Sequence, residues 1–249
     1  MDRVAFSIFG IDIMWYGILI ASGILLAVLV SSKEASRLGY KEGQVTDICL
    51  FAVPLGIVGA RLYYVAFNWS QYAGDFREII NIRGGGLAIH GGILAGIFTV
   101  WIYTRIKKLE FFKTADILVL GLPMAQAIGR WGNFINGEAH GGPTNLPWAI
   151  LVDGQRVHPT FLYESVWDWL IFIYIFMIRK NKKYEGQLLV DYIFLYSLGR
   201  FFIEGLRTDS LMLGPIRMAQ LISLVGILVA LVVRYFLLKR KALEKESGK

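Results

Sequence analysis

The sequence predicts an all-α polytopic membrane protein with seven transmembrane helices, which form a single integral membrane domain over residues 1–249. Of its 249 residues, 55% are hydrophobic, which is too apolar a composition for a soluble domain. The apolar residues are concentrated in long runs that match the thickness of a bilayer, and short charged segments separate these runs. The lysines and arginines are also shared unequally between alternate segments, as is typical of membrane proteins.

Residues 4–13 form an apolar segment flanked by charges. We expect this segment to lie at the membrane interface and to lead into the first of the spans. Trp15 and Tyr16 open the first span, because amphipathic rings favour the headgroup zone. The second span carries Arg61 near its end, where the side chain either reaches back to the interface or serves a site inside the membrane. In the third span small residues recur every four positions, which favours close helix packing. The expected spans are about 14–30, 46–67 and 87–103, and the small residues are Ala88, Gly92 and Gly96.

The other four spans carry several charged side chains. Glu164 and Asp168 are one helical turn apart in the fifth span, and Arg200 and Glu204 are four residues apart in the sixth, so each pair shares a helix face. The longest connection, residues 132–160, is extracytoplasmic in this prediction and contains a small hairpin that turns at Asp153-Gly154. A basic tail that follows the last span is expected to fray. The spans are about 114–130, 161–178, 187–206 and 215–238.

The distribution of positive charge predicts the orientation. Sixteen lysines and arginines fall in the loops after spans one, three and five and in the C-terminal tail, whereas six fall in the N-terminus and the other loops. The positive-inside rule therefore places the N-terminus outside and the C-terminus in the cytoplasm. In this topology Arg61, Arg130, Arg200, His90 and the carboxylates of span five all lie in the outer half of the bilayer. One cavity open to the outer side explains this common depth.

The segment 129–142 is the most informative stretch of the chain, because it leaves the fourth span with an arginine, two asparagines, a glutamate, a histidine and five glycines. These polar groups cannot remain unpaired in hydrocarbon, so the segment must line a wet or protein-walled cavity. Glycines allow the backbone to approach a ligand closely, and arginine and asparagine donate hydrogen bonds to anions. The alternative is a polar loop with an arginine at a helix end.

The segment 129–142 resembles the signature of the bacterial prolipoprotein diacylglyceryl transferases. Shorter motifs of that family match in the same order, and the resemblance extends from about Trp15 to Gln220. The long signature is specific, whereas each short motif alone is weak. The short motifs are Trp15-Tyr16-Gly17, Gly59-Ala60-Arg61, Gly84-Gly85-Gly86, His90-Gly91-Gly92, His158-Pro159, Tyr163-Glu164, Tyr196 to Arg200, Glu204 and Arg207.

The resemblance implies an enzyme that moves the diacylglyceryl group of phosphatidylglycerol to the cysteine thiol of a lipoprotein signal peptide, forming a thioether and releasing glycerol phosphate. It implies no metal or organic cofactor and no nucleic acid partner. Its partners are phosphatidylglycerol, prolipoprotein signal peptides and the surrounding membrane lipids. The expected location is the bacterial cytoplasmic membrane, with the active site facing the outer leaflet.

The chemistry of this reaction suggests roles for particular residues. Arg130 and Arg200 are candidates for stabilising the leaving phosphate, because guanidinium groups match phosphate oxygens. His90 is the candidate base for the thiol, although the field of the arginines would serve the same purpose without a base. Glu138 and Glu204 are expected to orient the arginines. The residues expected to bind substrate are Tyr16, Arg61, Asn133, Asn136, Glu138, Gly141, Tyr196, Glu204 and Arg207.

Two other classes of protein fit parts of the pattern. A small transporter or channel for an organic anion would explain the intramembrane arginines and the interrupted helices. Three features of this chain argue against a transporter or channel, namely the odd number of spans, the lack of an internal repeat and the confinement of polar residues to one leaflet. A seven-span receptor is supported only by the number of spans.

Overall fold

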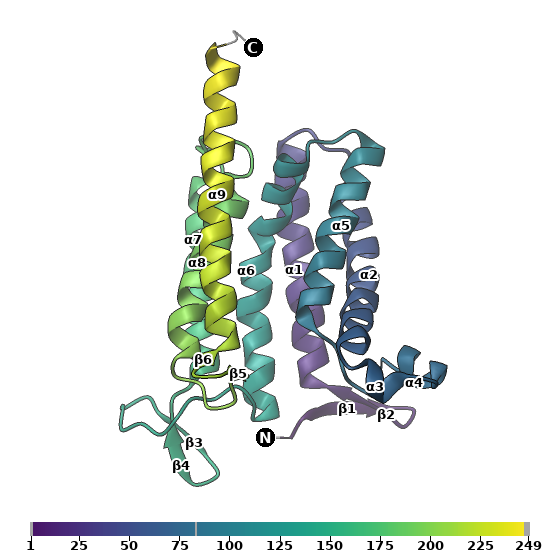
Figure 1. Cartoon of the computed structure of the whole chain (residues 1–249), viewed down its shortest axis with the longest axis vertical. Coiled ribbons are helices and arrows are strands. Elements are labelled where there is room, and N and C mark those ends of the chain that lie inside the picture. The colour runs from purple at the N-terminus through teal and green to yellow at the C-terminus, as the bar shows by residue number, and fades with distance from the viewer. Residues whose placement is uncertain (1, 83, 247–249) are drawn as a thin grey trace. The chain divides into compact units, whose positions relative to one another are not determined.

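The structure is a computed structural model that describes residues 2–82 and 84–246 of the chain. Residues 1, 83 and 247–249 lie outside the described residues, and they include Arg83 and Lys249, two of the charges used to predict the orientation. The chain divides into two compact units, one formed by Met1–Ser31 with Asp116–Lys249 and the other by Ser32–Ala115 (Figure 1). We refer to them as the large unit and the small unit.

The large unit begins with an antiparallel hairpin of β1 (Val4–Ile8) and β2 (Ile11–Met14), and helix α1 (Trp15–Arg37) follows directly. Within this unit α1 packs against α6 (Phe111–Asn136) through small residues. A Cβ atom at Gly121 would lie only 2.6 Å from the Ala27 carbonyl oxygen. The absence of a side chain at Gly121 therefore allows the two helices to approach this closely.

Three further helices complete the large unit, namely α7 (Thr160–Ile178), α8 (Gln187–Glu204) and α9 (Met218–Glu246). They surround a buried core to which α6, α7 and α8 each contribute two residues. The first turn of α8 is held by the buried Asp116, which accepts hydrogen bonds from the backbone N–H groups of Gly186 and Leu189 at 2.9 and 3.0 Å. The core residues are Val119, Leu120, Ile171, Ile175, Leu188 and Tyr192.

Two short hairpins follow α6 and α8. In the first, β3 (Ile150–Val152) pairs with β4 (Gln155–Val157), and in the second, β5 (Met212–Leu213) pairs with β6 (Ile216–Arg217). Asp153 and Gly154 both have positive φ angles, of 48° and 79°. This is the backbone of a two-residue turn that matches the twist of paired strands, so the predicted hairpin is confirmed.

The small unit consists of α2 (Gln44–Phe67) packed against α5 (Ile89–Lys107), with two short helices, α3 (Trp69–Tyr72) and α4 (Phe76–Ile80), between them in sequence. The closest approach is at Gly59, where a Cβ atom would lie 2.7 Å from the Gly91 carbonyl oxygen. A Cβ atom at Gly92 would lie 3.3 Å from the Gly56 carbonyl oxygen, whereas one at Gly96 would have no atom of another described segment within 4 Å. The small-residue face predicted for this helix is therefore correct at Gly92 and wrong at Gly96.

Six helices of the described chain are long and apolar enough to cross a membrane, namely α1, α2, α5, α6, α7 and α9. Helix α8 is not among them, because its 18 residues include Asp191, Arg200 and Glu204. The protein is thus a mostly helical, multi-pass membrane protein, and the seventh span stays a prediction.

Several helices are longer than the predicted spans. Helix α1 continues to Arg37. Lys33 and Glu34 are therefore helical, whereas the sequence predicted a loop after residue 30. Helix α6 continues through Arg130 to Asn136, and α9 continues to Glu246, where the sequence predicted a frayed tail. The difference arises because hydropathy predicts only the part of a helix in hydrocarbon, whereas charged residues such as Lys, Glu and Arg favour helix beyond it.

Candidate functional site

The large unit contains a cluster of three arginines arranged around one carboxylate, Glu164. Arg130 comes from the last part of α6, Arg200 from α8, and Arg207 from the segment that follows α8. Arg130 Nη1 lies 2.7 Å from Glu164 Oε2, Arg200 Nη1 contacts Glu164 Oε1, and Arg207 Nη1 lies 3.7 Å from the same oxygen. Glu164 is only 4% exposed, so three guanidinium groups converge on one buried anionic group.

Further carboxylates surround this arginine cluster. Glu204 Oε2 lies 2.6 Å from Arg200 Nη2 and 3.9 Å from Arg207 Nε, and Asp168 Oδ2 lies 4.0 Å from Arg130 Nε. Asp209 forms a two-pronged ion pair with Arg207, through N–O distances of 2.9 and 2.7 Å. The positive charge of the cluster is therefore compensated by Glu164, Glu204, Asp168 and Asp209, of which only Glu204 was expected from the sequence to orient the arginines.

These ion pairs are close in distance but not all are aligned as hydrogen bonds. Glu164 Oε2, Asp168 Oδ2 and Glu204 Oε2 are buried and have no aligned hydrogen-bond donor among the described residues. Arg130 also donates from Nη2 to the hydroxyl of Tyr196 at 3.3 Å, and Tyr196 stacks on Tyr192. Glu164 Oε2 and Glu204 Oε2 are therefore held by opposite charge at short distance, without an aligned hydrogen bond.

The signature after Arg130 is held in place by backbone contacts. Gly141 N–H donates to the His158 carbonyl oxygen at 2.8 Å, and Gly142 N–H donates to the Leu206 carbonyl oxygen at 3.0 Å. A Cβ atom at Gly141 would lie 2.7 Å from the His158 Cβ and 2.8 Å from the Leu206 carbonyl oxygen. Because position 141 has no side chain, the segment 129–142 packs between the backbone at His158 and that at Leu206. Gly141 also forms a β-bridge with Arg207 and thereby positions this arginine.

The remaining signature residues lie on the same end of α6, with fewer contacts. The ring of Tyr16 packs on α6 at Gly132, where a Cβ atom would lie 3.1 Å from its Cε2. Asn133 and Asn136 are half-buried and contribute backbone carbonyls, Asn133 to Glu138 N–H and Asn136 to the Arg3 side chain. Glu138 is exposed, and among the described residues no ion pair forms to it. The expectation that Glu138 orients the arginines is not met, whereas Glu204 does contact Arg200 and Arg207.

In the small unit, Arg61 is bound by backbone carbonyls. Its Nε donates to Ile79 O at 3.0 Å, its Nη1 donates to Gly85 O and Gly86 O at 2.7 and 3.1 Å, and its Nη2 donates to Glu78 O. The guanidinium carbon also lies 4.9 Å from the centre of the Tyr72 ring. Arg61 is 4% exposed, and its contacts describe a residue that shapes the segment leading to α5.

His90 lies at the second residue of α5, also in the small unit. Its side chain is exposed, and its ring centre lies 6.1 Å from that of Tyr63. Among the described residues we find no hydrogen-bond partner for its ring nitrogens. The close contact of Gly91 with Gly59 fixes the backbone of this turn and thereby the position of His90.

Two residues of the arginine cluster were not among the site residues predicted from the sequence. Glu164 and Asp168 were noted only as a pair on one face of an apolar helix, and Glu164 also lay within a matched family motif. Two carboxylates one turn apart in a helix of this hydropathy are costly unless they are paired. The free-energy cost of placing these two carboxylates in an apolar helix was the signal available from the sequence. Their partners are distant in sequence, so only the fold identifies them.

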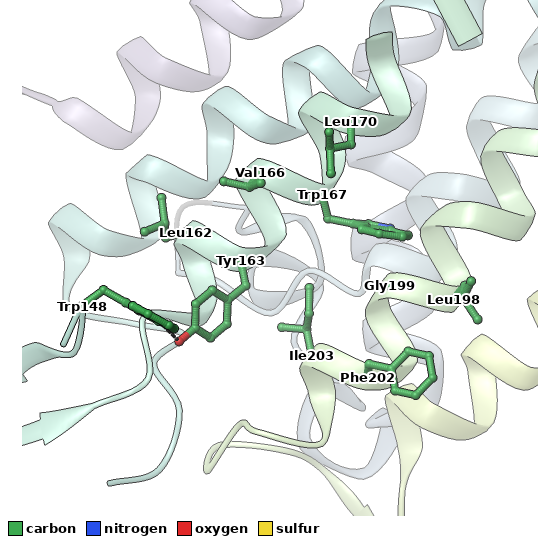
Figure 2. A pocket seen from close by; sticks show the side chains of 10 residues that line it. All are labelled: Trp148, Leu162, Tyr163, Val166, Trp167, Leu170, Leu198, Gly199, Phe202 and Ile203. Atoms are coloured by element: carbon green, nitrogen blue, oxygen red, sulfur yellow. Dashed lines mark hydrogen bonds between the residues drawn. The ribbon is translucent and has the colours of Figure 1, made fainter. Parts of the chain in front are cut away.

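The large unit also contains an apolar groove between α7 and α8, with a volume of about 550 Å³ (Figure 2). A second space of only about 10 Å³ lies among the charged residues of the arginine cluster, and Trp167 and Ile203 line both spaces. The groove is lined by Trp148, Leu162, Tyr163, Val166, Trp167, Leu170, Leu198, Gly199, Phe202 and Ile203. The described residues contain no group of three or more His, Cys, Asp or Glu side chains placed to hold a metal ion.

Comparison with known proteins places these features in a family context. A family model described as prolipoprotein diacylglyceryl transferase matches residues 3–236. A protein of Clostridioides difficile (strain 630), named phosphatidylglycerol–prolipoprotein diacylglyceryl transferase, is 64% identical over 240 residues, which cover 96% of this chain and 97% of the relative. Proteins of the same name from Finegoldia magna and Bacillus cytotoxicus are 53% and 45% identical, over 99% and 97% of this chain and 100% and 93% of the relatives.

Proposed function

The chain belongs to the prolipoprotein diacylglyceryl transferase family, and we propose that it transfers the diacylglyceryl group of phosphatidylglycerol to a prolipoprotein, the first step of lipoprotein maturation. The acceptor is the thiol of the signal-peptide cysteine. The sulfur forms a thioether bond to the glyceryl carbon, the bond from that carbon to the phosphate oxygen breaks, and glycerol phosphate leaves. The thiol proton is taken up by a base or by solvent.

The observation that carries the assignment of residues is the convergence of Arg130 and Arg200 on Glu164. One carboxylate oxygen contacts each guanidinium group, so the two arginines are already arranged to bind two oxygens of one anion. Phosphate offers the same kind of paired oxygens, and arginine binds them with geometric specificity. The phosphate of the donor lipid therefore takes over contacts that Glu164 makes when no lipid is bound.

This exchange gives the arginines a direct role in the reaction. Negative charge develops on the leaving phosphate as its bond to carbon breaks, and positioned cations stabilise that charge in a site with little water. Glu204 contacts both Arg200 and Arg207 and orients them for this task. Arg130 and Arg200 are thus assigned to the phosphate, with Arg207 and Tyr196 as further contacts to the headgroup.

Activation of the thiol has two explanations. His90 is exposed at the start of α5 and is available as a base. Alternatively, the arginines stabilise the thiolate without a dedicated base. Full activity of His90→Asn at neutral pH would remove the first explanation. Tyr16, Asn133, Asn136, Glu138 and Gly141 remain assigned to the binding of substrate or to its positioning, whereas Arg61 is assigned to holding the segment that leads to α5.

The charges of α8 support its assignment as the seventh transmembrane helix. Arg200 and Glu204 are paired with each other, and Arg200 also contacts Glu164. Asp191 accepts hydrogen bonds from Tyr174 and Gln187 and lies 3.7 Å from Arg234. Since these charges have partners inside the protein, α8 is able to cross hydrocarbon. The proposed topology has the N-terminus outside the bacterial cytoplasmic membrane and the site facing the outer leaflet.

A transfer assay tests the proposed function. Purified protein is mixed with phosphatidylglycerol and a peptide that carries a lipoprotein-type cysteine, and the peptide mass is measured. We expect a mass gain of one diacylglyceryl unit that is absent with a Cys→Ser peptide. If phosphatidylglycerol binds tightly but the peptide mass does not change, the transferase assignment is overturned and transport of an anion becomes the better explanation.

A further inference from the structure

The apolar groove between α7 and α8 forms a hollow in the surface of the large unit. Its ten lining residues are apolar or aromatic apart from Gly199. Three of them, Leu162, Val166 and Leu170, follow one another at intervals of four residues, so the groove runs along α7 for about 12 Å. A concave apolar space of about 550 Å³ lies within the range of binding pockets for small ligands.

The two ends of the groove differ in polarity. At one end Trp148 Nε1 donates to the Tyr163 hydroxyl at 2.9 Å (Figure 2). His158 Nδ1 lies 3.2 Å from the same hydroxyl. At the other end Leu170 of α7 and Leu198 of α8 are apolar. Rings with a polar tip are typical of the headgroup zone. The groove therefore has one end suited to the polar part of a lipid and one end suited to hydrocarbon.

Trp167 joins the groove to the arginine cluster. Its indole N–H donates to the Leu195 carbonyl oxygen at 2.9 Å, which fixes the ring against α8. A Cβ atom at position 199 would lie 2.7 Å from Trp167 Cε2 and closer still to Cδ1, so only glycine fits beside the ring. Since Trp167 and Ile203 line both spaces, a ligand in the groove lies directly beside the arginine cluster.

An anionic group and an apolar chain thus have adjacent sites in one unit of the molecule. An occupant that is apolar and lies beside the arginine cluster at Trp167 and Ile203 suits a hydrocarbon chain of the lipid whose phosphate the arginines are proposed to bind. We propose that the groove binds one acyl chain of the phospholipid donor and that Leu170 and Leu198, at its far end, limit the length of that chain. This inference rests on the proposed function and adds to it a site of chain-length selection.

The test compares two donors with two variants. Leu170→Trp fills the far end of the groove, and Leu170 is 53% exposed, so the change is compatible with folding. Met177→Trp, on the same helix but outside the groove and 72% exposed, is the matched control. Each protein is assayed with dilauroyl and distearoyl phosphatidylglycerol as short-chain and long-chain donors. Activity with the short-chain donor also shows that a variant is folded.

We expect Leu170→Trp to lower kcat/KM for the long-chain donor by about tenfold relative to the short-chain donor, because overfilling an apolar pocket discriminates by this order. Met177→Trp should leave the ratio of the two donors unchanged. An equal loss on both donors, no loss on either, or a rise confined to the KM of the peptide would each overturn the acyl-chain site. A wild-type protein that transfers neither donor would instead overturn the proposed function.

Discussion

Arg61 is buried and Arg130 is partly buried, both in predicted membrane spans, but their partners differ in kind. Arg61 donates only to backbone carbonyl oxygens, those of Glu78, Ile79, Gly85 and Gly86. Arg130 faces the carboxylates of Glu164 and Asp168. Backbone carbonyl oxygens cannot move away from the arginine unless the segment that carries them unfolds. A carboxylate partner carries the same charge as a phospholipid headgroup, so the headgroup is able to replace it.

The comparison shows that the role of a charged side chain inside the protein depends on whether its partner is main chain or an oppositely charged side chain. A charge bound by main chain stabilises a local conformation. A charge bound by a side chain of opposite sign forms an exchangeable pair, which is suited to ligand binding. Substitutions at Arg130, Arg61, Glu164 and Asp209 test this distinction.

Arg130→Lys keeps the positive charge but removes the two-pronged donor. We expect kcat of the transfer reaction to fall by about a hundredfold or more, the usual cost of losing one positioned donor to a developing charge. The measurement is the rate of peptide modification by mass spectrometry. Arg234→Lys is the matched control, because Arg234 is half-exposed in α9 and lies 3.7 Å from Asp191. A normal rate for Arg130→Lys would contradict the phosphate assignment.

Arg61→Gln leaves several buried carbonyl oxygens without a donor. We expect the free energy of unfolding to fall by about 2–3 kcal/mol, with near-normal transfer at temperatures where the variant is folded. Thermal unfolding in detergent and transfer at low temperature are the two measurements. Arg77→Gln, an exposed arginine of the same segment, should change neither. Loss of transfer by folded Arg61→Gln would show that Arg61 binds substrate and would break the comparison.

Glu164→Gln keeps the shape of the side chain and removes the charge that competes with the headgroup. If exchange occurs, the KM for phosphatidylglycerol should fall several-fold, while kcat falls by about tenfold because the arginines lose the carboxylate that orients them. Initial rates at varied lipid concentration separate the two constants. An increase in KM would indicate that Glu164 holds the arginines in place but does not compete with lipid.

Asp209→Asn should have the smallest effect of the four. Burial opposes ionisation of this carboxyl, but the hydrogen bond and charge of Arg207 outweigh burial and lower the pKa of Asp209 below 3.8. A lowered pKa in the folded state gives stability that is present above the ordinary value and is lost as pH falls through the lowered one. Because Asp209 is half-exposed and its ion pair is screened, we expect a loss below about 1 kcal/mol.

The unfolding temperature of wild type and Asp209→Asn, measured at neutral and at acidic pH, checks this prediction. The two proteins should differ slightly at neutral pH and converge when the pH falls below the lowered pKa. A large difference at neutral pH, or a severe loss of transfer, would mean that Asp209 supports the arginine cluster more strongly than a surface ion pair does.

The sequence by itself determined the features that depend on residues close together in the chain. Runs of apolar residues predicted six of the helices that the structure shows as candidate spans, and Asp153-Gly154 predicted the hairpin turn. The segment 129–142 and the shorter motifs predicted the family. These signals are local, because hydrophobic periodicity and turn conformation are set by neighbouring residues.

The contacts between charged side chains that are distant in sequence are determined by the tertiary fold. Glu164 meets Arg130 and Arg200 across 34 and 36 positions of sequence, and no local pattern encodes such a contact. The same holds for Arg61, whose partners are backbone atoms that any residues would supply, and for Trp167, which packs on Gly199. Ion pairs and grooves between helices arise from how helices pack, so the sequence predicted the charged residues of the site and the fold determined what each of them contacts.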